Sequence, residues 1–214
     1  DVFRMYLMFG FSYTEGGPWN DDGIKSIAKF LDRIERLVLR INPLKSKNTT
    51  MGSAEKELNY QRNYTVLNIN RDMENFSFNT ALARMMEYVN ALYKYDNIED
   101  EKKNIKFMKE CLQTLILLLA PFAPHFSEEL WSLTGNKKSV FLSEYPEADE
   151  TALVKDETEY AVQVNSKMKG KIMVSKDSDE ATIIDAAKNE PKVKEAIEGK
   201  TVAKVIVISG RLVN

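Results

Sequence analysis

The chain has 214 residues, enough for one or two domains that each bury a hydrophobic core. Its 43% hydrophobic and 29% charged residues are ordinary for a soluble globular protein. The longest apolar run, residues 112–120, contains Gln113 and Thr114 and is too short to span a bilayer, so no membrane association is expected. The single cysteine, Cys111, excludes an internal disulfide framework and favours a reducing compartment, which we expect to be the cytoplasm.

The net charge of −2 is unevenly distributed along the chain. From Tyr160 onward there are 10 Lys and Arg against 7 Asp and Glu, a net charge of +3. The preceding residues carry 20 basic against 25 acidic side chains, a net charge of −5. A small basic region behind an acidic body weakly indicates an anionic partner.

Residues 1–11 are unusually apolar for the start of a chain. We expect this segment to contact another surface, as it would in a piece of a longer protein. Gly16-Gly17-Pro18 then interrupts the chain.

Apolar residues at helical spacing predict a helix that Asp21 or Asp22 caps and that runs to Ile41. Its opposite face is basic. The basic residues are Lys25, Lys29, Arg33, Arg36 and Arg40. Such a face is either a solvated outer surface or a surface that faces phosphate groups.

A polar loop at residues 42–53 is followed by three more segments with helical periodicity. The first of them is expected to bury Leu58, Val66, Ile69, Met73 and Phe76. The other two start near Asn79 and near Glu99. Their methionines are interpreted as core filling, because thioethers pack into irregular gaps.

Two prolines redirect the chain after the fourth helix. Pro121 is expected to push Ala120 out of the helical region, and Pro124 suits the first turn of a fifth helix. Phe141 and Tyr145-Pro146 are expected to pin the irregular segment that follows, residues 136–155, to the bundle. These helices predict an α-helical bundle over residues 1–152.

From Tyr160 the apolar period changes from helical to two. Residues 160–164 and 169–174 predict a β-hairpin, and helical segments and a buried strand at 203–208 follow it. This order predicts a small α+β domain over residues 158–214, joined to the bundle by a hinge at about residues 148–159. The predicted fold class is therefore mainly α: a helical bundle followed by a small α+β domain.

The chain lacks the usual residues of a catalytic or metal site. His125 is the only histidine, and with one cysteine it cannot supply the nitrogen and sulfur ligands of a zinc site. No glycine-rich phosphate loop occurs. We therefore assign no catalytic residue, metal or cofactor to this chain.

Three lysines on the second predicted strand are the clearest candidates for binding. They are Lys167, Lys169 and Lys171. Strand alternation predicts that they share one face, with the apolar residues of the strand on the other. Those apolar residues are Met168, Ile172 and Val174. The lysines either protect an edge strand from aggregation or contact a nucleic-acid backbone, which Gly170 between them would allow to approach closely.

Several motifs resemble those of class I aminoacyl-tRNA synthetases. The string APFAPHFSEELW at residues 120–131 is similar to a segment of the helical anticodon-binding domain in the leucine, valine and isoleucine group. FNTA at 78–81 and VQVNSKMKGKI at 162–172 resemble segments of bacterial-type leucyl-tRNA synthetases, and GRLVN at 210–214 resembles their C-terminus. DVFR at residues 1–4 resembles the segment that follows their KMSKS loop.

The resemblance implies a tRNA-binding C-terminal portion of an enzyme that ligates leucine to tRNA(Leu) with ATP and magnesium. The catalytic domain, with its ATP-binding motifs, would lie upstream in the same parent chain, and the enzyme is expected to be a monomer. The bundle would lie along the tRNA and the tail would meet its outer corner, through backbone and shape contacts. This portion alone is expected to be inactive.

The tRNA-binding candidates fall into two groups. In the tail they are Lys167, Lys169, Gly170, Lys171 and Arg211. In the bundle they are Lys25, Arg33, Arg40, Arg62 and Arg71. Two alternatives remain: a helical protein-interaction module without RNA binding, and the same portion of a valyl or isoleucyl enzyme.

Overall fold

The computed structural model describes residues 1–12, 15–154, 157–165, 167–175, 178–198, 205–208 and 212–213. It divides the chain into two compact units, the bundle unit Asp1–Leu153 and the tail unit Val154–Asn214. No helix among the described residues is both long enough and apolar enough to cross a membrane.

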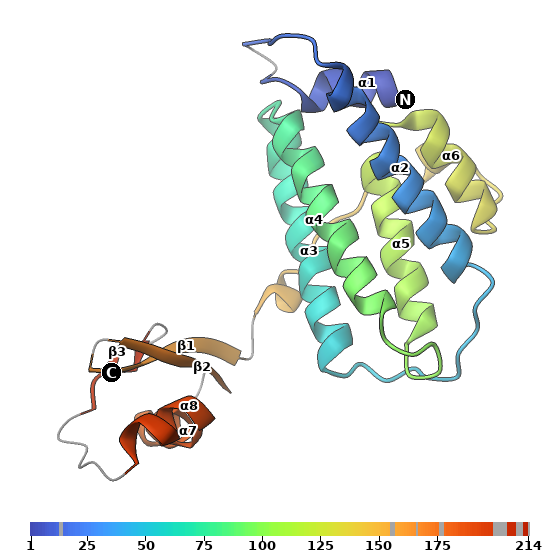
Figure 1. The fold of residues 1–214 in the computed structure, drawn as a ribbon. Helices are drawn as coiled ribbons and strands as arrows, with labels where there is room; N and C mark the ends of the chain where they lie inside the picture. The colour runs from blue at the N-terminus through green and yellow to red at the C-terminus, as the bar shows by residue number, and fades with distance from the viewer. Residues whose placement is uncertain are drawn as a thin grey trace. The chain divides into compact units, whose positions relative to one another are not determined.

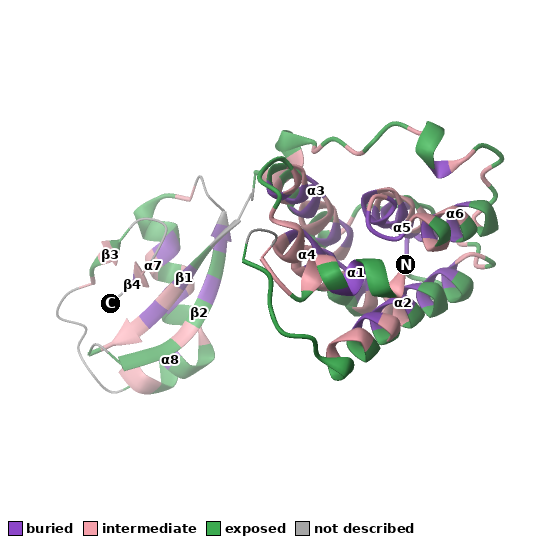
Figure 2. Ribbon diagram, turned by 90° about the horizontal axis from the view of Figure 1, so that it is seen from above, coloured by how far each residue is buried: buried purple, intermediate pink, exposed green. Residues whose placement is uncertain are grey.

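The bundle unit is built from helices that pack around one hydrophobic core (Figure 1). The helices are α1 (Val2–Phe9), α2 (Asp21–Ile41), α3 (Ser53–Glu74), α4 (Phe78–Asp96), α5 (Ile105–Leu119) and α6 (Pro124–Leu133). Figure 2 shows that their buried sides face one another in the centre of the unit. Met85, Leu92 and Leu115 are completely buried there, as the apolar periodicity predicts.

Polar side chains set where two of the helices begin. The side chain of Asn20, and not of Asp21 or Asp22, accepts a hydrogen bond from the first turn of α2. Asn104 caps α5 by accepting from the Phe107 N–H at 3.1 Å. The helix α5 therefore begins at Ile105, six residues after the start predicted near Glu99. The residues between form a turn.

The end of α3 also differs from the prediction. The helix stops at Glu74, and Phe76 adopts a φ of 55° that reverses the chain. The Phe76 side chain is consequently 58% exposed, although its spacing predicts an inward position. Leu58, Val66 and Ile69 are buried as expected.

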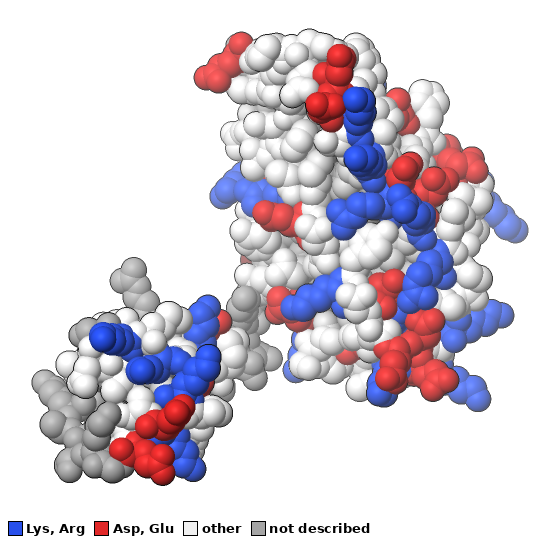
Figure 3. Space-filling model, in the orientation of Figure 1, with Lys and Arg blue, Asp and Glu red and all other residues white. Residues whose placement is uncertain are grey.

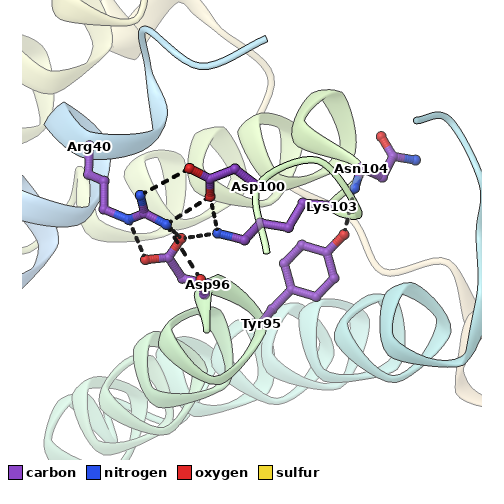
Figure 4. Close-up of polar contacts among 6 residues, drawn as sticks. All are labelled: Arg40, Tyr95, Asp96, Asp100, Lys103 and Asn104. Atoms are coloured by element: carbon purple, nitrogen blue, oxygen red, sulfur yellow. Dashed lines mark hydrogen bonds and ion pairs between the residues drawn. The ribbon is translucent and has the colours of Figure 1, made fainter. Parts of the chain in front are cut away.

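The turn between α4 and α5 is held by a cluster of four charged residues, the Lys103 cluster (Figure 4). It consists of Arg40, Asp96, Asp100 and Lys103. The Lys103 side chain is completely buried, and its ammonium group lies 2.7 Å from an oxygen of both aspartates. Arg40 of α2 donates two hydrogen bonds of 2.7 Å to the Asp96 carboxylate.

The electrostatics of the cluster are balanced. Burial tends to raise the pKa of Asp96, but hydrogen bonds from Arg40 and Lys103 outweigh it and hold that pKa below its ordinary value. Hydrogen bonds from Lys103 and Arg40 likewise lower the pKa of Asp100. Two carboxylates and two cations thus neutralise one another across three segments of the chain.

The corner between α5 and α6 is only partly as predicted. The helix α5 ends at Leu119, but Ala120 keeps helical angles of −53° and −41° despite the following proline. The chain then turns, with the Ala123 N–H donating to the Leu119 carbonyl at 2.9 Å, before Pro124 opens α6. The redirection therefore takes place in the turn after Ala120 and not at Ala120 itself.

Of the residues predicted to hold the segment after α6, Phe141 does not pack on the bundle, since it is 57% exposed, but the Pro146 carbonyl accepts a hydrogen bond of 3.2 Å from the Asn70 side chain of α3. In the short helix η1 (Val140–Leu142), Val140 is buried and its N–H donates to the Glu128 carboxylate at 3.0 Å. Further on, the Asp149 N–H donates to the Asn63 side chain of α3 at 2.8 Å. The helix η2 (Glu150–Leu153) also contacts α3, so the bundle unit extends to Leu153.

This arrangement predicts where proteolysis begins. Limited trypsin treatment should first cut after Lys155, which follows the boundary between the two units in the sequence. The residues before the boundary are tied to α3, so cuts there should be slower. Fragment masses measured over time would check this order. Cuts distributed through both units, with one unfolding transition, would contradict independent units.

Among its described residues, the tail unit forms a four-stranded sheet with two helices packed on it. Its elements are β1 (Glu157–Val164), β2 (Lys167–Ser175), α7 (Glu180–Asn189), α8 (Pro191–Ile197), β3 (Val207–Ile208) and β4 (Leu212–Val213). The strand order is β2-β1-β4-β3, with β1 and β2 antiparallel and β4 parallel to β1. The short strand β4 was not predicted as a separate element, and it joins the predicted hairpin to β3.

Candidate nucleic-acid interface

The three candidate lysines lie on β2, which is an edge strand of the tail sheet. The pairing of β1 with β2 contains a bulge: Val162 pairs with Gly170, but Gln163 pairs with Met168, so Lys169 is the extra residue. All three lysines are exposed. In Figure 3, basic side chains gather over this hairpin and acidic ones lie over the helices next to it.

The prediction that the three lysines share one sheet face is wrong because of the bulge. Lys171 pairs with Ala161, whereas Lys167 pairs with Val164, and paired residues project to the same face. Val164 packs against the core of the tail unit, so the register places Lys167 on the helix-covered side and Lys171 on the open side. Met168, predicted to lie on the apolar face, is 57% exposed. The lysines are therefore not gathered on one face: Lys167 and Lys171 lie on opposite faces of β2, with Lys169 at the bulge between them.

Lys171 also has a partner on the neighbouring strand. Its ammonium group lies 2.8 Å from a carboxylate oxygen of Glu159, and both side chains are about half exposed. An ion pair this open to solvent is weak, so an anionic ligand could compete for the lysine at little cost.

Gly170 leaves room for a contact within the chain. A Cβ at this position would lie 2.5 Å from the Glu190 carboxyl carbon. Glu190 is the N-cap of α8 and accepts a hydrogen bond from the Val193 N–H at 2.8 Å. The close approach that Gly170 allows is thus made by Glu190 of the same chain.

Replacing Gly170 with alanine should lower the free energy of unfolding of the tail unit by about 0.5–2 kcal/mol, the usual value of an N-cap. The added methyl group would displace the Glu190 carboxylate from the start of α8. Urea denaturation of the single and double variants with Glu190→Ala would measure this. The reductions caused by Gly170→Ala and Glu190→Ala should be less than additive in the double variant. Fully additive reductions would contradict the idea that Gly170→Ala acts by displacing the Glu190 cap.

The basic side chains of α2 run along the surface of the bundle with acidic ones beside them (Figure 3). Lys25 lies 3.0 Å from Asp22, and both side chains are well exposed. Arg33 donates to the Asn90 side chain at 2.8 Å, and its guanidinium lies 5.0 Å from the centre of the Tyr93 ring. Arg40 is engaged in the Lys103 cluster (Figure 4).

These contacts rank the candidates of α2. A phosphate would have to compete with two aspartates for Arg40, one of them largely buried. Lys25 and Arg33 are opposed by one exposed carboxylate and one neutral amide, so they are the more available pair.

The two candidates of α3 lie in different surroundings. Arg62 donates to the Asn59 side chain at 2.8 Å, and its guanidinium lies 5.3 Å from the centre of the Phe107 ring, so it is directed toward α5. Arg71 is exposed. Arg211, the remaining candidate, lies outside the described residues.

A pair of tyrosines on α3 was missed at the level of sequence. The rings of Tyr60 and Tyr64 stack with centroids 6.0 Å apart and an angle of 15° between their planes. Tyr64 is 39% exposed and Leu67, nearly one turn further on, is 44% exposed. The four-residue spacing of two aromatics was the available signal, and exposed aromatic rings are the groups on which nucleic-acid bases stack.

The groups that could do covalent or metal chemistry are poorly placed for it. Burial raises the pKa of the Cys111 thiol to about 11, so it is protonated near neutral pH. Within the described ranges, no three His, Cys, Asp or Glu residues lie close enough together to hold a metal ion. The exposed cations and aromatic rings are groups to which an anionic polymer such as a nucleic acid can bind.

The arrangement of a helical bundle with exposed cations agrees with a comparison against known families. The chain belongs to the family described as the anticodon-binding domain of tRNA ligases, whose model matches residues 55–184.

Within this family, the chain is similar to leucine–tRNA ligases in sequence and to a solved LeuRS in structure. The chain is 56% identical, over its whole length, to a leucine–tRNA ligase of Clostridium perfringens and 50% identical to that of Clostridium kluyveri. It spans only 26% and 27% of the length of these relatives. It also resembles the agnB2 LeuRS of Agrobacterium radiobacter K84, whose structure is a ternary complex with tRNA and LeuAMS. The TM-score is 0.75 at 26% identity, over 100% of this chain and 28% of that one.

Proposed function

We propose that this chain is the C-terminal, tRNA-binding portion of a leucyl-tRNA synthetase that attaches leucine to tRNA(Leu). The observation that carries the proposal is the 56% identity to a leucine–tRNA ligase across the entire chain, both units included. The likeness to a LeuRS bound to tRNA supports the same interpretation.

In this proposal the two units hold the tRNA by its backbone and shape. Lys25 and Arg33 of the bundle and the three lysines of β2 would contact phosphates. ATP and magnesium would bind in the catalytic part of the same parent chain, outside these residues. The parent would act as a monomer in the cytoplasm, where protein synthesis takes place.

The proposal is tested by separating binding from chemistry. The chain alone should bind tRNA(Leu) but show no leucine-dependent exchange of pyrophosphate into ATP, whereas the full-length parent should show both activities. A tRNA of another amino acid is the control for binding. Pyrophosphate exchange above background by the purified chain would contradict the assignment of catalysis to another part of the parent.

A further inference from the structure

The helix α6 begins without a capping side chain of its own. Its N-cap residue is Ala123, which cannot accept a hydrogen bond through its side chain, and its first residue is Pro124. The N–H groups of a helix's first turn have no partners within the helix and need an acceptor from elsewhere. The N-cap residue of α6 therefore provides no side-chain cap.

Asp1 supplies the missing acceptor from the other end of the unit's sequence. Its Oδ2 accepts a hydrogen bond of 2.7 Å from the N–H of Phe126, the third residue of α6. Its Oδ1 lies 3.3 Å from the ring Nδ1 of His125. The Asp1 side chain is only 11% exposed.

Asp1 is at the N-cap position of its own helix but makes no side-chain cap there. An aspartate in this position ordinarily accepts from the first turn of the helix that it begins. Its carboxylate is directed to α6 instead, and Figure 1 shows the chain's N-terminus beside the start of α6.

Arg4 makes the matching contact on the other side of the corner. It lies three residues after Asp1 on α1, and its Nη2 donates to the Pro121 carbonyl at 3.2 Å, just beyond the end of α5. A cation at the C-terminal end of α5 and an anion at the N-terminal end of α6 both match the helix dipoles. The N-cap residue of α1 and a residue of its first turn thus bind the two helix ends that meet at the corner.

We propose that Asp1 and Arg4 are positioning residues for the transfer of leucine to tRNA. They fix α1 to the α5–α6 corner and so set the orientation of the tRNA-binding bundle relative to the catalytic part that precedes α1 in the parent. The inference rests on the proposed function. The apolar contacts of α1, such as that of the buried Met5, are not directional, whereas hydrogen bonds are. The Tyr6 hydroxyl accepts one from the Asn20 N–H at the start of α2, but those of Asp1 and Arg4 are the ones that reach the α5–α6 corner.

The test uses the full-length parent with Asp1→Ala and Arg4→Ala, singly and together. Leucine-dependent pyrophosphate exchange without tRNA should be unchanged. The kcat for charging tRNA(Leu) should fall by about tenfold in the double variant, as expected for the removal of one or two capping interactions. The KM for tRNA should change little, because the tRNA-binding surfaces remain. Asp1→Asn keeps an acceptor oxygen and should retain part of the kcat.

Two controls separate positioning from stability. The pair Glu99 and Lys102 has the same three-residue spacing and lies 2.8 Å apart on the surface of the α4–α5 turn. Its replacement by alanines should leave both reactions unchanged. Ile41→Val, at a completely buried site in the last turn of α2, should lower the melting temperature while leaving the hydrogen bonds of Asp1 and Arg4 in place.

The outcomes are distinct. If Ile41→Val reduces kcat as much as Asp1→Ala at an equal shift in melting temperature, Asp1 only stabilises the fold and the inference is overturned. Unchanged charging by the double variant overturns it as well. Failure of the wild-type parent to charge tRNA(Leu) at all would instead reject the proposed function.

Discussion

Replacing Lys103 with methionine should lower the free energy of unfolding of the bundle unit by about 3 kcal/mol, near the lower end of the range for breaking a buried ion pair. The side chain is completely buried between Asp96 and Asp100. Methionine preserves most of its volume but leaves both carboxylates without their shared cation. Arg40 would still neutralise Asp96, which keeps the effect from being larger. Urea denaturation followed by circular dichroism measures the change.

The neighbouring Lys102 provides a matched control. Its side chain is 70% exposed and lies 2.8 Å from Glu99 in a surface ion pair. Lys102→Met removes the same charge from the same turn and should cost no more than about 1 kcal/mol, because exposed ion pairs contribute little. Equal effects of the two variants would show that the Lys103 cluster does not hold the turn.

Changing Lys167, Lys169 and Lys171 together to alanine should weaken binding of tRNA(Leu) by the full-length parent and flatten its salt dependence. For every phosphate that the variant no longer neutralises, the slope of log K against log salt should fall by about 0.7–0.9. Pyrophosphate exchange without tRNA should be unaffected, because the tail unit carries none of the proposed catalytic groups. Filter binding at several salt concentrations measures the affinity for tRNA(Leu) and its salt dependence.

Two comparisons make the result specific to the hairpin. Lys188, Lys192 and Lys194 are exposed on α7 and α8 of the same unit, and their replacement by alanine changes the net charge equally. This second triple variant should affect binding less. Glu159→Gln frees Lys171 from its ion pair and should strengthen binding. Equal effects of the two triple variants would mean that only the net charge of the tail unit matters.

The lysine experiment also distinguishes the two surfaces considered for RNA. If alanine at Lys25 and Arg33 weakens binding and the hairpin variant does not, the bundle is the RNA surface and the tail has another role. Arg40 is less available to RNA than Lys25 and Arg33, because its guanidinium donates hydrogen bonds to Asp96 and Asp100.

The helices, the hairpin and the family could be inferred from the order of residues alone. Periodicity placed α2 to α6, because burial of one face imposes a 3.6-residue repeat that is visible in the chain. The motifs at residues 78–81, 120–131 and 162–172 indicated the family that the comparison confirms. Residue types also identified the lysines of β2 as exposed, since long charged side chains are rarely buried.

The sequence did not reveal which charged groups are engaged within the fold or in which direction side chains point. Both depend on how the segments of the chain pack together. The aspartates that pair with Lys103 lie only seven and three residues before it, but Arg40, which shares them, comes from α2, and Asp1 meets α6 across 125 residues. Neither long-range contact is marked by the residues around it. The bulge at Lys169 depends on the register of β1, and a single inserted residue moves Lys167 to the other face. Periodicity records which face of an element is buried. It carries no information on which distant partner a polar side chain meets, and that partner determines whether a cation stabilises the fold or remains available to bind.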